Sequence, residues 1–223
     1  MAAKLYQFLG SPFCAKVRKL LAFKGVEFEV VEVDYLERKE LLLASGQLTV
    51  PAVTFENGET IVDSARIALR LEELHPEPTI FPAGWRGMHV ALADYIDNHL
   101  EEKVYPVALA DELAYYSKQG ADRGALWRFI RERKFGKGFV DRTIEDHSAN
   151  WDRFCGALAP FEEQLGNGPF LTGRIGLADF ALYGQLYYLA FSGELKIPAE
   201  MKNLRAFFRR VDRISSIVEE TAG

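Results

Sequence analysis

A short loop near the N-terminus carries the residues best suited to chemistry. Ser11 follows a strand-like run, Lys4 to Leu9, and precedes a run with helical spacing that begins at Phe13. A loop that enters a helix N-terminus exposes backbone N–H groups, and these groups and the helix dipole stabilise negative charge. A thiolate at such a place has a lowered pKa, and the Ser11 hydroxyl can donate a hydrogen bond to it. The loop is therefore a candidate site for activating the thiol of a bound ligand.

Cys14 stands three residues after Ser11, which is the spacing of a redox C-x-x-C motif with its first cysteine replaced by serine. The first thiol of such a pair is usually the attacking one, so intramolecular dithiol chemistry is lost and Cys14 is left as a redox candidate. Both residues also have purely structural interpretations. Ser11 can be a plain helix N-cap, and Cys14 can be a small buried apolar residue. The motif alone leaves these alternatives open.

Two later dipeptides can hold a peptide ligand near this loop. A cis bond at Val50-Pro51 would turn the Val50 backbone toward Ser11, where it can pair with an extended peptide, whereas a trans bond would merely start a strand. Asp63-Ser64 begins a helix, where Ser64 and the local N–H groups can hold a carboxylate and Asp63 an ammonium, or where the pair is only a cap. The two dipeptides together offer partners for a peptide with an α-amino acid end group.

The elements that position these residues follow the order β-α-β-α-β-β-α. Strands are expected at Lys4 to Leu9, Val26 to Val33, Ala52 to Glu56 and Thr60 to Val62, with a hairpin turn at Asn57-Gly58. Helices are expected from Phe13 to Gly25, Asp34 to Ala44 and Ser64 to Leu74. In the first helix, Lys16 and Lys24 are assigned to the side opposite the apolar face. The pattern predicts a mixed four-stranded sheet with helices on its faces.

A change in composition divides the chain into two domains. Residues 1–76 form the mixed α/β domain, residues 77–84 are a linker rich in proline, and residues 85–223 form an all-α bundle, so the fold class is a two-domain α+β/α protein. Helices of the second domain are expected at Trp85 to Lys118, Gly138 to Leu165, Leu177 to Phe191 and Glu200 to Val211.

Composition excludes several function classes. The formal net charge of -5 gives no general attraction for nucleic acid. No apolar run is long enough for a membrane span, and no cluster of Cys, His and carboxylates has the spacing of a zinc site. With only two, distant cysteines and no signal-peptide pattern, a cytoplasmic protein without metal is expected.

The residues quoted above resemble those of the cytosolic glutathione S-transferases. The thioredoxin-like domain of that family is matched in order by Ser11-Pro12-Phe13 followed by Val17-Arg18, then Val50-Pro51, then Asp63-Ser64. Among the serine-type classes, the motif sequence is most similar to that of the tau class. The resemblance implies that Ser11 activates glutathione. It also implies a homodimer and a glutathione site at Phe13, Thr49, Val50, Pro51, Asp63 and Ser64. Gly176 and Asp179 match a helix-capping box of the family, with glycine where serine or threonine is usual.

Two departures and one open question accompany the resemblance. Thr49 stands where the family often has lysine or arginine, and Asp63 is shorter than the usual glutamate or glutamine. The second substrate is expected to be a hydrophobic electrophile, bound by candidates Tyr105, Leu109, Tyr115 and Tyr116, which can equally be core or dimer surface. The alternatives are a glutathione-dependent thiol oxidoreductase or lyase that uses Cys14, and a non-catalytic binding protein.

Overall fold

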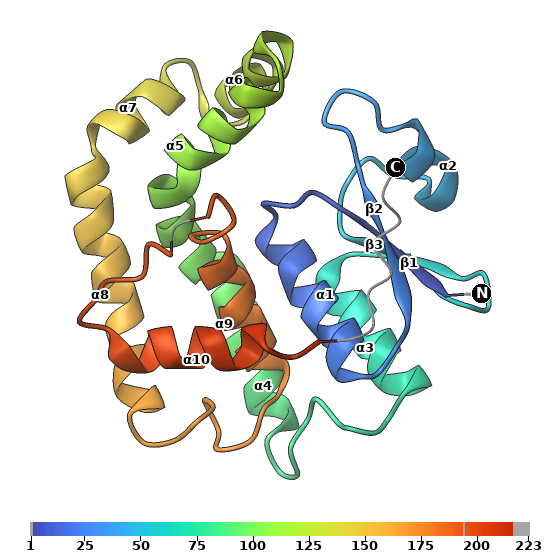
Figure 1. Ribbon diagram of the computed structural model, residues 1–223. Coiled ribbons are helices and arrows are strands. Elements are labelled where there is room, and N and C mark those ends of the chain that lie inside the picture. The colour runs from blue at the N-terminus through green and yellow to red at the C-terminus, as the bar shows by residue number, and fades with distance from the viewer. Residues whose placement is uncertain (1, 194, 216–223) are drawn as a thin grey trace.

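The computed structural model describes residues 2–193 and 195–215, and Figure 1 shows a sheet-containing part beside a helical part. The strands are β1 (Ala3–Gln7), β2 (Phe28–Glu32), β3 (Ala52–Thr54) and β4 (Thr60–Val62). The helices of the first part are α1 (Pro12–Phe23), α2 (Lys39–Ser45) and α3 (Ser64–Leu74). The second part holds α4 (Arg86–Tyr95), the π-helical turn η1 (Ile96–Leu100), α5 (Glu101–Gln119), α6 (Ala121–Phe135), α7 (Phe139–Glu145), α8 (His147–Leu165), α9 (Leu177–Tyr187) and α10 (Lys202–Asp212).

The sheet has the strand order β2-β1-β3-β4, which confirms the mixed four-stranded sheet. β1 and β2 run parallel, while β1 with β3 and β3 with β4 are antiparallel. Tyr6 near the end of β1 pairs with Ala52 at the start of β3. The loop that follows β1 therefore leaves the sheet at the same edge at which Val50 and Pro51 enter it.

Helix α1 lies between the sheet and α9 (Figure 1). The Ser11 side chain caps its N-terminus and Pro12 occupies its first position, where a missing N–H costs nothing. Gly184 in α9 lets the two helices approach closely, because a Cβ there would lie 2.4 Å from the carbonyl oxygen of Pro12. The helical part of the molecule thus fixes the position of the helix that carries Ser11.

The two parts share one continuous apolar core. Buried members come from the sheet part and from the helical part alike, for example Leu5, Val53, Ile67, Leu158, Phe180 and Leu204. The placement of Lys16 and Lys24 on a polar side of α1 was wrong, because the two residues are only 1% and 6% exposed. Each meets a carboxylate from another element, Lys16 at Asp97 and Lys24 at Glu72, which makes their burial tolerable.

The helix expected from Gly138 to Leu165 is two helices, since α7 ends at Glu145 and α8 begins at His147. In α7 the Thr143 hydroxyl donates to the carbonyl of Phe139 at 2.7 Å, a local bond of the kind that bends helices. The expected second domain, residues 85–223, includes residue 194 and residues 216–223, which lie outside the described part of the chain.

Helix α9 begins with an unusual cap. As expected from the capping box, Asp179 accepts a hydrogen bond from the Gly176 N–H, at 2.9 Å, and another from the Leu171 N–H. Gly176 has no side chain to complete the cap, and His89 from α4 takes that place. Nδ1 of His89 accepts from the N–H of Ala178 at 3.2 Å, while its Nε2 lies 2.9 Å from the Thr172 hydroxyl. A neutral imidazole with its proton on Nε2 satisfies both contacts.

We expect His89 to make stability depend on pH. Burial lowers the pKa of His89 below its ordinary value of 6.5, so the unfolded chain binds the proton more tightly. The contribution of His89 to the free energy of unfolding is complete above about pH 6.5. It is lost as the pH falls toward the folded-state pKa, by up to about 1.4 kcal/mol per pH unit. Urea unfolding of the wild type and of His89→Gln, which keeps an acceptor but does not titrate, measures this. A constant difference between the two proteins from about pH 7.5 to about pH 5 would contradict it.

Candidate functional site

Ser11 sits in a loop that is anchored from behind. The N–H of Leu9 donates to Glu32 Oε1 at 2.6 Å, and the N–H of Ser11 donates to the carbonyl of Phe8. Ser11 Oγ accepts from the N–H of Cys14 at 3.3 Å, so the residue is an N-cap as the structural alternative holds. That bond uses a lone pair of the oxygen, and the hydroxyl hydrogen remains able to donate. The cap and the proposed chemical role are therefore compatible.

Cys14 lies on the buried side of α1 and is fully inaccessible to solvent. Burial raises the pKa of its thiol to about 12, although the Ser11 hydroxyl and nearby Arg18 oppose the rise. A thiolate is the nucleophilic form, and this environment disfavours it. The surroundings of Cys14 are those of a core residue.

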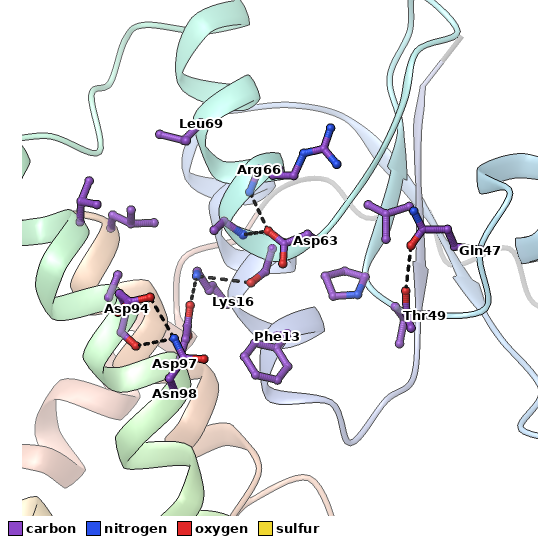
Figure 2. A pocket seen from close by; sticks show the side chains of 18 residues that line it. Phe13, Lys16, Gln47, Thr49, Asp63, Arg66, Leu69, Asp94, Asp97 and Asn98 are labelled. Atoms are coloured by element: carbon purple, nitrogen blue, oxygen red, sulfur yellow. Dashed lines mark hydrogen bonds and ion pairs between the residues drawn. The ribbon is translucent and has the colours of Figure 1, made fainter.

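A cavity of about 640 Å³ opens between the sheet part and the helical part (Figure 2). We call it the first cavity. Its lining includes Phe13, Lys16, Thr49, Val50, Pro51, Asp63, Ser64, Arg66, Asp94, Asp97 and Asn98. All six residues expected to bind glutathione from the family resemblance, and the backbone of α3 that follows them, thus face one another across a space large enough for a small peptide.

The N-terminus of α3 forms one wall of the first cavity. Asp63 has a φ of 86° and its Oδ1 accepts from the N–H groups of Ala65 and Arg66, both at 3.0 Å. Ser64 is 5% exposed, and its Oγ accepts from Lys16 Nζ at 3.4 Å. Lys16 in turn meets Asp97 of η1 (Figure 2). Sequence reasoning missed Lys16 and Asp97, because no pattern in either segment shows that they face each other.

A second cavity, of about 240 Å³, holds Ser11. Phe13, Thr49 and Val50 line both cavities, so the Ser11 end and the Asp63–Ser64 end lie in adjacent cavities on either side of these three residues. The Val50-Pro51 bond is cis, which is the form expected to turn the Val50 backbone toward Ser11. Among the described residues, the N–H and C=O of Val50 have no hydrogen-bond partner and are free to pair with an extended ligand.

Arg38 supplies a cation near the place where Thr49 offers none. It lines the second cavity, and its guanidinium donates to the carbonyl oxygens of Tyr35 and Leu48. The guanidinium also lies over the rings of Phe8 and Tyr35, at 5.0 and 4.9 Å from their centroids. Sequence reasoning missed Arg38, which precedes α2 without any motif.

The far wall of the second cavity is polar, which differs from the expected hydrophobic lining. Arg131 donates to Glu112 at 3.0 Å, and the Tyr188 hydroxyl donates to the other oxygen of Glu112 at 2.7 Å. Glu101 also lines the cavity, and burial raises the pKa of its carboxyl. Tyr105 lies here as well, and burial raises the pKa of its phenol. The space can therefore hold a ligand with polar groups beside an apolar portion.

Three candidates for the second substrate lie elsewhere. Leu109 is fully buried in a core cluster with Tyr35, Trp127 and Val140, and it is not among the residues that line the cavity. Tyr116 belongs to the same cluster, with its ring 4.3 Å from that of Tyr35. Tyr115 and Tyr116 border a separate hollow beside Gln119. Of the four candidates, Tyr105 alone shares a cavity with Ser11.

Two family models of known proteins match this chain. Residues 5–79 match the family model of the glutathione S-transferase N-terminal domain, and residues 124–210 match that of the C-terminal domain. The chain belongs to the glutathione S-transferase family. Its class within that family stays open.

Individual relatives are distant. A probable glutathione S-transferase of Nicotiana tabacum is 36% identical over 106 residues, which is 47% of this chain and 46% of that protein. Maleylacetoacetate isomerase of Pseudomonas aeruginosa is 25% identical over 82% of this chain and 80% of its own length. The crystal structure of a Ceriporiopsis subvermispora glutathione S-transferase in complex with glutathione superposes with a TM-score of 0.81 at 17% identity, over 98% of this chain and all of that one. At this identity the structure shows the shared fold.

Within residues 2–193 and 195–215 no group of three or more His, Cys, Asp or Glu side chains is arranged to hold a metal ion. None of the helices in the same described residues has the length and apolar character needed to cross a membrane.

Proposed function

We propose that this chain is a glutathione transferase that binds glutathione along the two adjacent cavities and activates its thiol with Ser11. The γ-glutamyl end lies at Asp63 and Ser64, where the helix N-terminus and the hydroxyl receive its carboxylate and Asp63 its ammonium. The cysteinyl backbone pairs with Val50 beside Pro51, with Phe13 and Thr49 alongside. The observation that carries the proposal is that Phe13, Thr49 and Val50 line both cavities and so join the two ends of the site.

Catalysis then comes from thiolate stabilisation and from proximity. The Ser11 hydroxyl donates to the thiolate at the N-terminus of α1, where the helix dipole also favours negative charge. An electrophile in the second cavity is held beside the sulfur and is attacked there, the carbon–sulfur bond forming as the leaving group departs or as the acceptor carbon takes a proton. We keep a hydrophobic small-molecule electrophile as the second substrate and Tyr105 as a contact for it, with the polar wall at Arg131 and Glu112 as an addition to the expected apolar lining.

The alternatives are less well supported. A thiol oxidoreductase or lyase that depends on Cys14 requires a reachable thiolate, and burial with a pKa of about 12 works against one. A binding protein without activity stays an alternative, because Thr49 lacks a charge. Arg38 weakens that alternative by placing a cation in the same cavity. A homodimer and a cytoplasmic location are part of the proposal, the latter in keeping with two cysteines that are both free.

Calorimetry with S-methylglutathione tests the binding step, and Arg38 gives it a specific prediction. We expect Arg38→Met to weaken binding about tenfold or more, because a guanidinium–carboxylate hydrogen bond to the glycyl end is lost. The glycyl ethyl ester of the same ligand should bind the wild type and Arg38→Met with similar, weaker affinity. Lys39→Met, which removes a neighbouring exposed cation that does not line either cavity, should bind like the wild type. Absence of any binding to the wild type would leave no transferase to propose.

A further inference from the structure

The buried ammonium of Lys16 has no role in the proposed mechanism, yet it forms part of the floor of the first cavity. Its side chain is 1% exposed, and its Nζ lies 2.5 Å from Asp97 Oδ2 and 3.4 Å from Ser64 Oγ (Figure 2). The contacts join three elements, namely α1, η1 and the first residue of α3. The charge of Lys16 is neutralised by Asp97, so the ammonium needs no ligand to balance it.

The contact with Ser64 restricts the direction of one hydrogen atom. An ammonium group can only donate, so Ser64 Oγ must present a lone pair to Lys16. The single hydrogen of the hydroxyl then has to point elsewhere. No acceptor for it occurs among the described protein residues, and Ser64 lines the first cavity. The hydrogen is therefore directed into the cavity.

We propose that Lys16 is a positioning residue that, held by Asp97, turns the Ser64 hydroxyl into a donor aimed at the α-carboxylate of the γ-glutamyl group. The inference rests on the proposed function, since that function places this carboxylate at Ser64. Without Lys16 the Ser64 hydroxyl would be free to rotate. Ligand binding would then have to fix the hydroxyl in the orientation that donates to the carboxylate, at a cost in entropy. Asp97 acts one step further away, by holding the ammonium in place from the helical part of the molecule.

A pair of ligands isolates this effect. S-methylglutathione carries the α-carboxylate, and the same tripeptide with γ-aminobutyryl in place of γ-glutamyl lacks it. We expect the wild type to bind the first about 10- to 100-fold more tightly, the range for a hydrogen bond to a charged group. In Lys16→Met this ratio should fall about threefold, because a freely rotating hydroxyl samples about three staggered positions and one of them donates to the carboxylate. Ser64→Ala, which removes the donor, should lose nearly all of the ratio, while Lys16→Arg, which is also a pure donor, should largely keep it.

The double variant Lys16→Met with Ser64→Ala shows whether Lys16 acts through Ser64. If it does, Lys16→Met no longer changes the ratio once Ser64→Ala is present, whereas a direct effect of charge on the ligand would make the two changes additive. Additive changes, or an unchanged ratio in Lys16→Met, would overturn the proposal. Failure of the wild type to bind either peptide would instead remove the proposed function itself, a result distinct from these.

Stability is controlled with a matched lysine. Lys24 is on the same helix, its side chain is fully buried, and its Nζ lies 2.5 Å from Glu72 Oε2, but it lines neither cavity. Lys24→Met should lower stability as Lys16→Met does and leave the ligand ratio at the wild-type value. If Lys16→Met does not fold, the combination of Lys16→Met with Asp97→Leu removes both charges together, which is far better tolerated, and should show the same reduced ratio.

Discussion

Ser11→Ala is expected to lower kcat for conjugation of an aryl halide to glutathione by about 10²- to 10³-fold, with the KM for glutathione changed little. The loss of one hydrogen-bond donor to a negatively charged group, here the glutathione thiolate, lowers the rate by this order of magnitude. The contacts at Val50, Asp63 and Ser64 are untouched, so ground-state binding survives. At saturating glutathione, the pH profile of kcat/KM for the aryl halide should also move toward higher pH, because the pKa of the bound thiol returns toward its ordinary value of about 8.5.

The control for this experiment must separate the hydroxyl's donation from its role as a cap. Ser11 Oγ accepts from the Cys14 N–H, and losing that cap costs about 1 kcal/mol. Ser11→Asp keeps a cap acceptor but cannot donate when ionised, so it should also be inactive while its stability is retained. Full activity in either variant would rule out the mechanism. Cys14→Ala should conjugate at the wild-type rate, and loss of disulfide-reducing activity there would favour the oxidoreductase alternative.

Gly176→Ser is expected to destabilise the protein by about 1–3 kcal/mol, although serine is usually the better helix cap. A Cβ at this position would lie 2.4 Å from Cε1 of His89. The imidazole would have to leave, and with it would go the hydrogen bonds to Ala178 and Thr172. Urea unfolding of the variant at neutral pH measures the loss.

The combination of Gly176→Ser with His89→Ala should recover much of this stability. Removing the ring clears space for the serine, whose hydroxyl can then take over the cap that the imidazole made. His89→Ala alone leaves the N–H of Ala178 without its acceptor and should be destabilised. If the two changes simply add, His89 and Gly176 do not depend on each other and the interpretation of the cap is wrong.

The sheet and its site loops could be predicted because their signals are local. Alternating apolar residues mark the strands, and the β4 bounds, Thr60–Val62, were predicted without error. Asp179 could be predicted for the same reason, since a capping box needs only residues three positions apart. A pattern within a few residues is sufficient wherever the partner lies on the same or the next element.

The remaining features depend on partners far along the chain. A helical projection cannot show that Lys16 is buried, because its counter-ion Asp97 lies on a π-helical turn of the other part. Arg38 is positioned by stacking on Phe8 and Tyr35, which no spacing rule encodes. Leu109 was expected in a pocket, yet helix periodicity cannot distinguish a cavity wall from the core behind it.

The close approach of α1 to α9 at Gly184 limits how this protein can be recombined with its relatives. A chimaera that joins residues 1–76 to a foreign helical half would set a side chain against the Pro12 carbonyl wherever the donor lacks that glycine. It would also leave the buried Lys16 ammonium without a counter-ion wherever the donor lacks the Asp97 carboxylate. The two halves therefore cannot be exchanged freely between relatives. A chimaera that carries the Ser11 loop also needs a helical half with a glycine at the Gly184 position and a carboxylate at the Asp97 position.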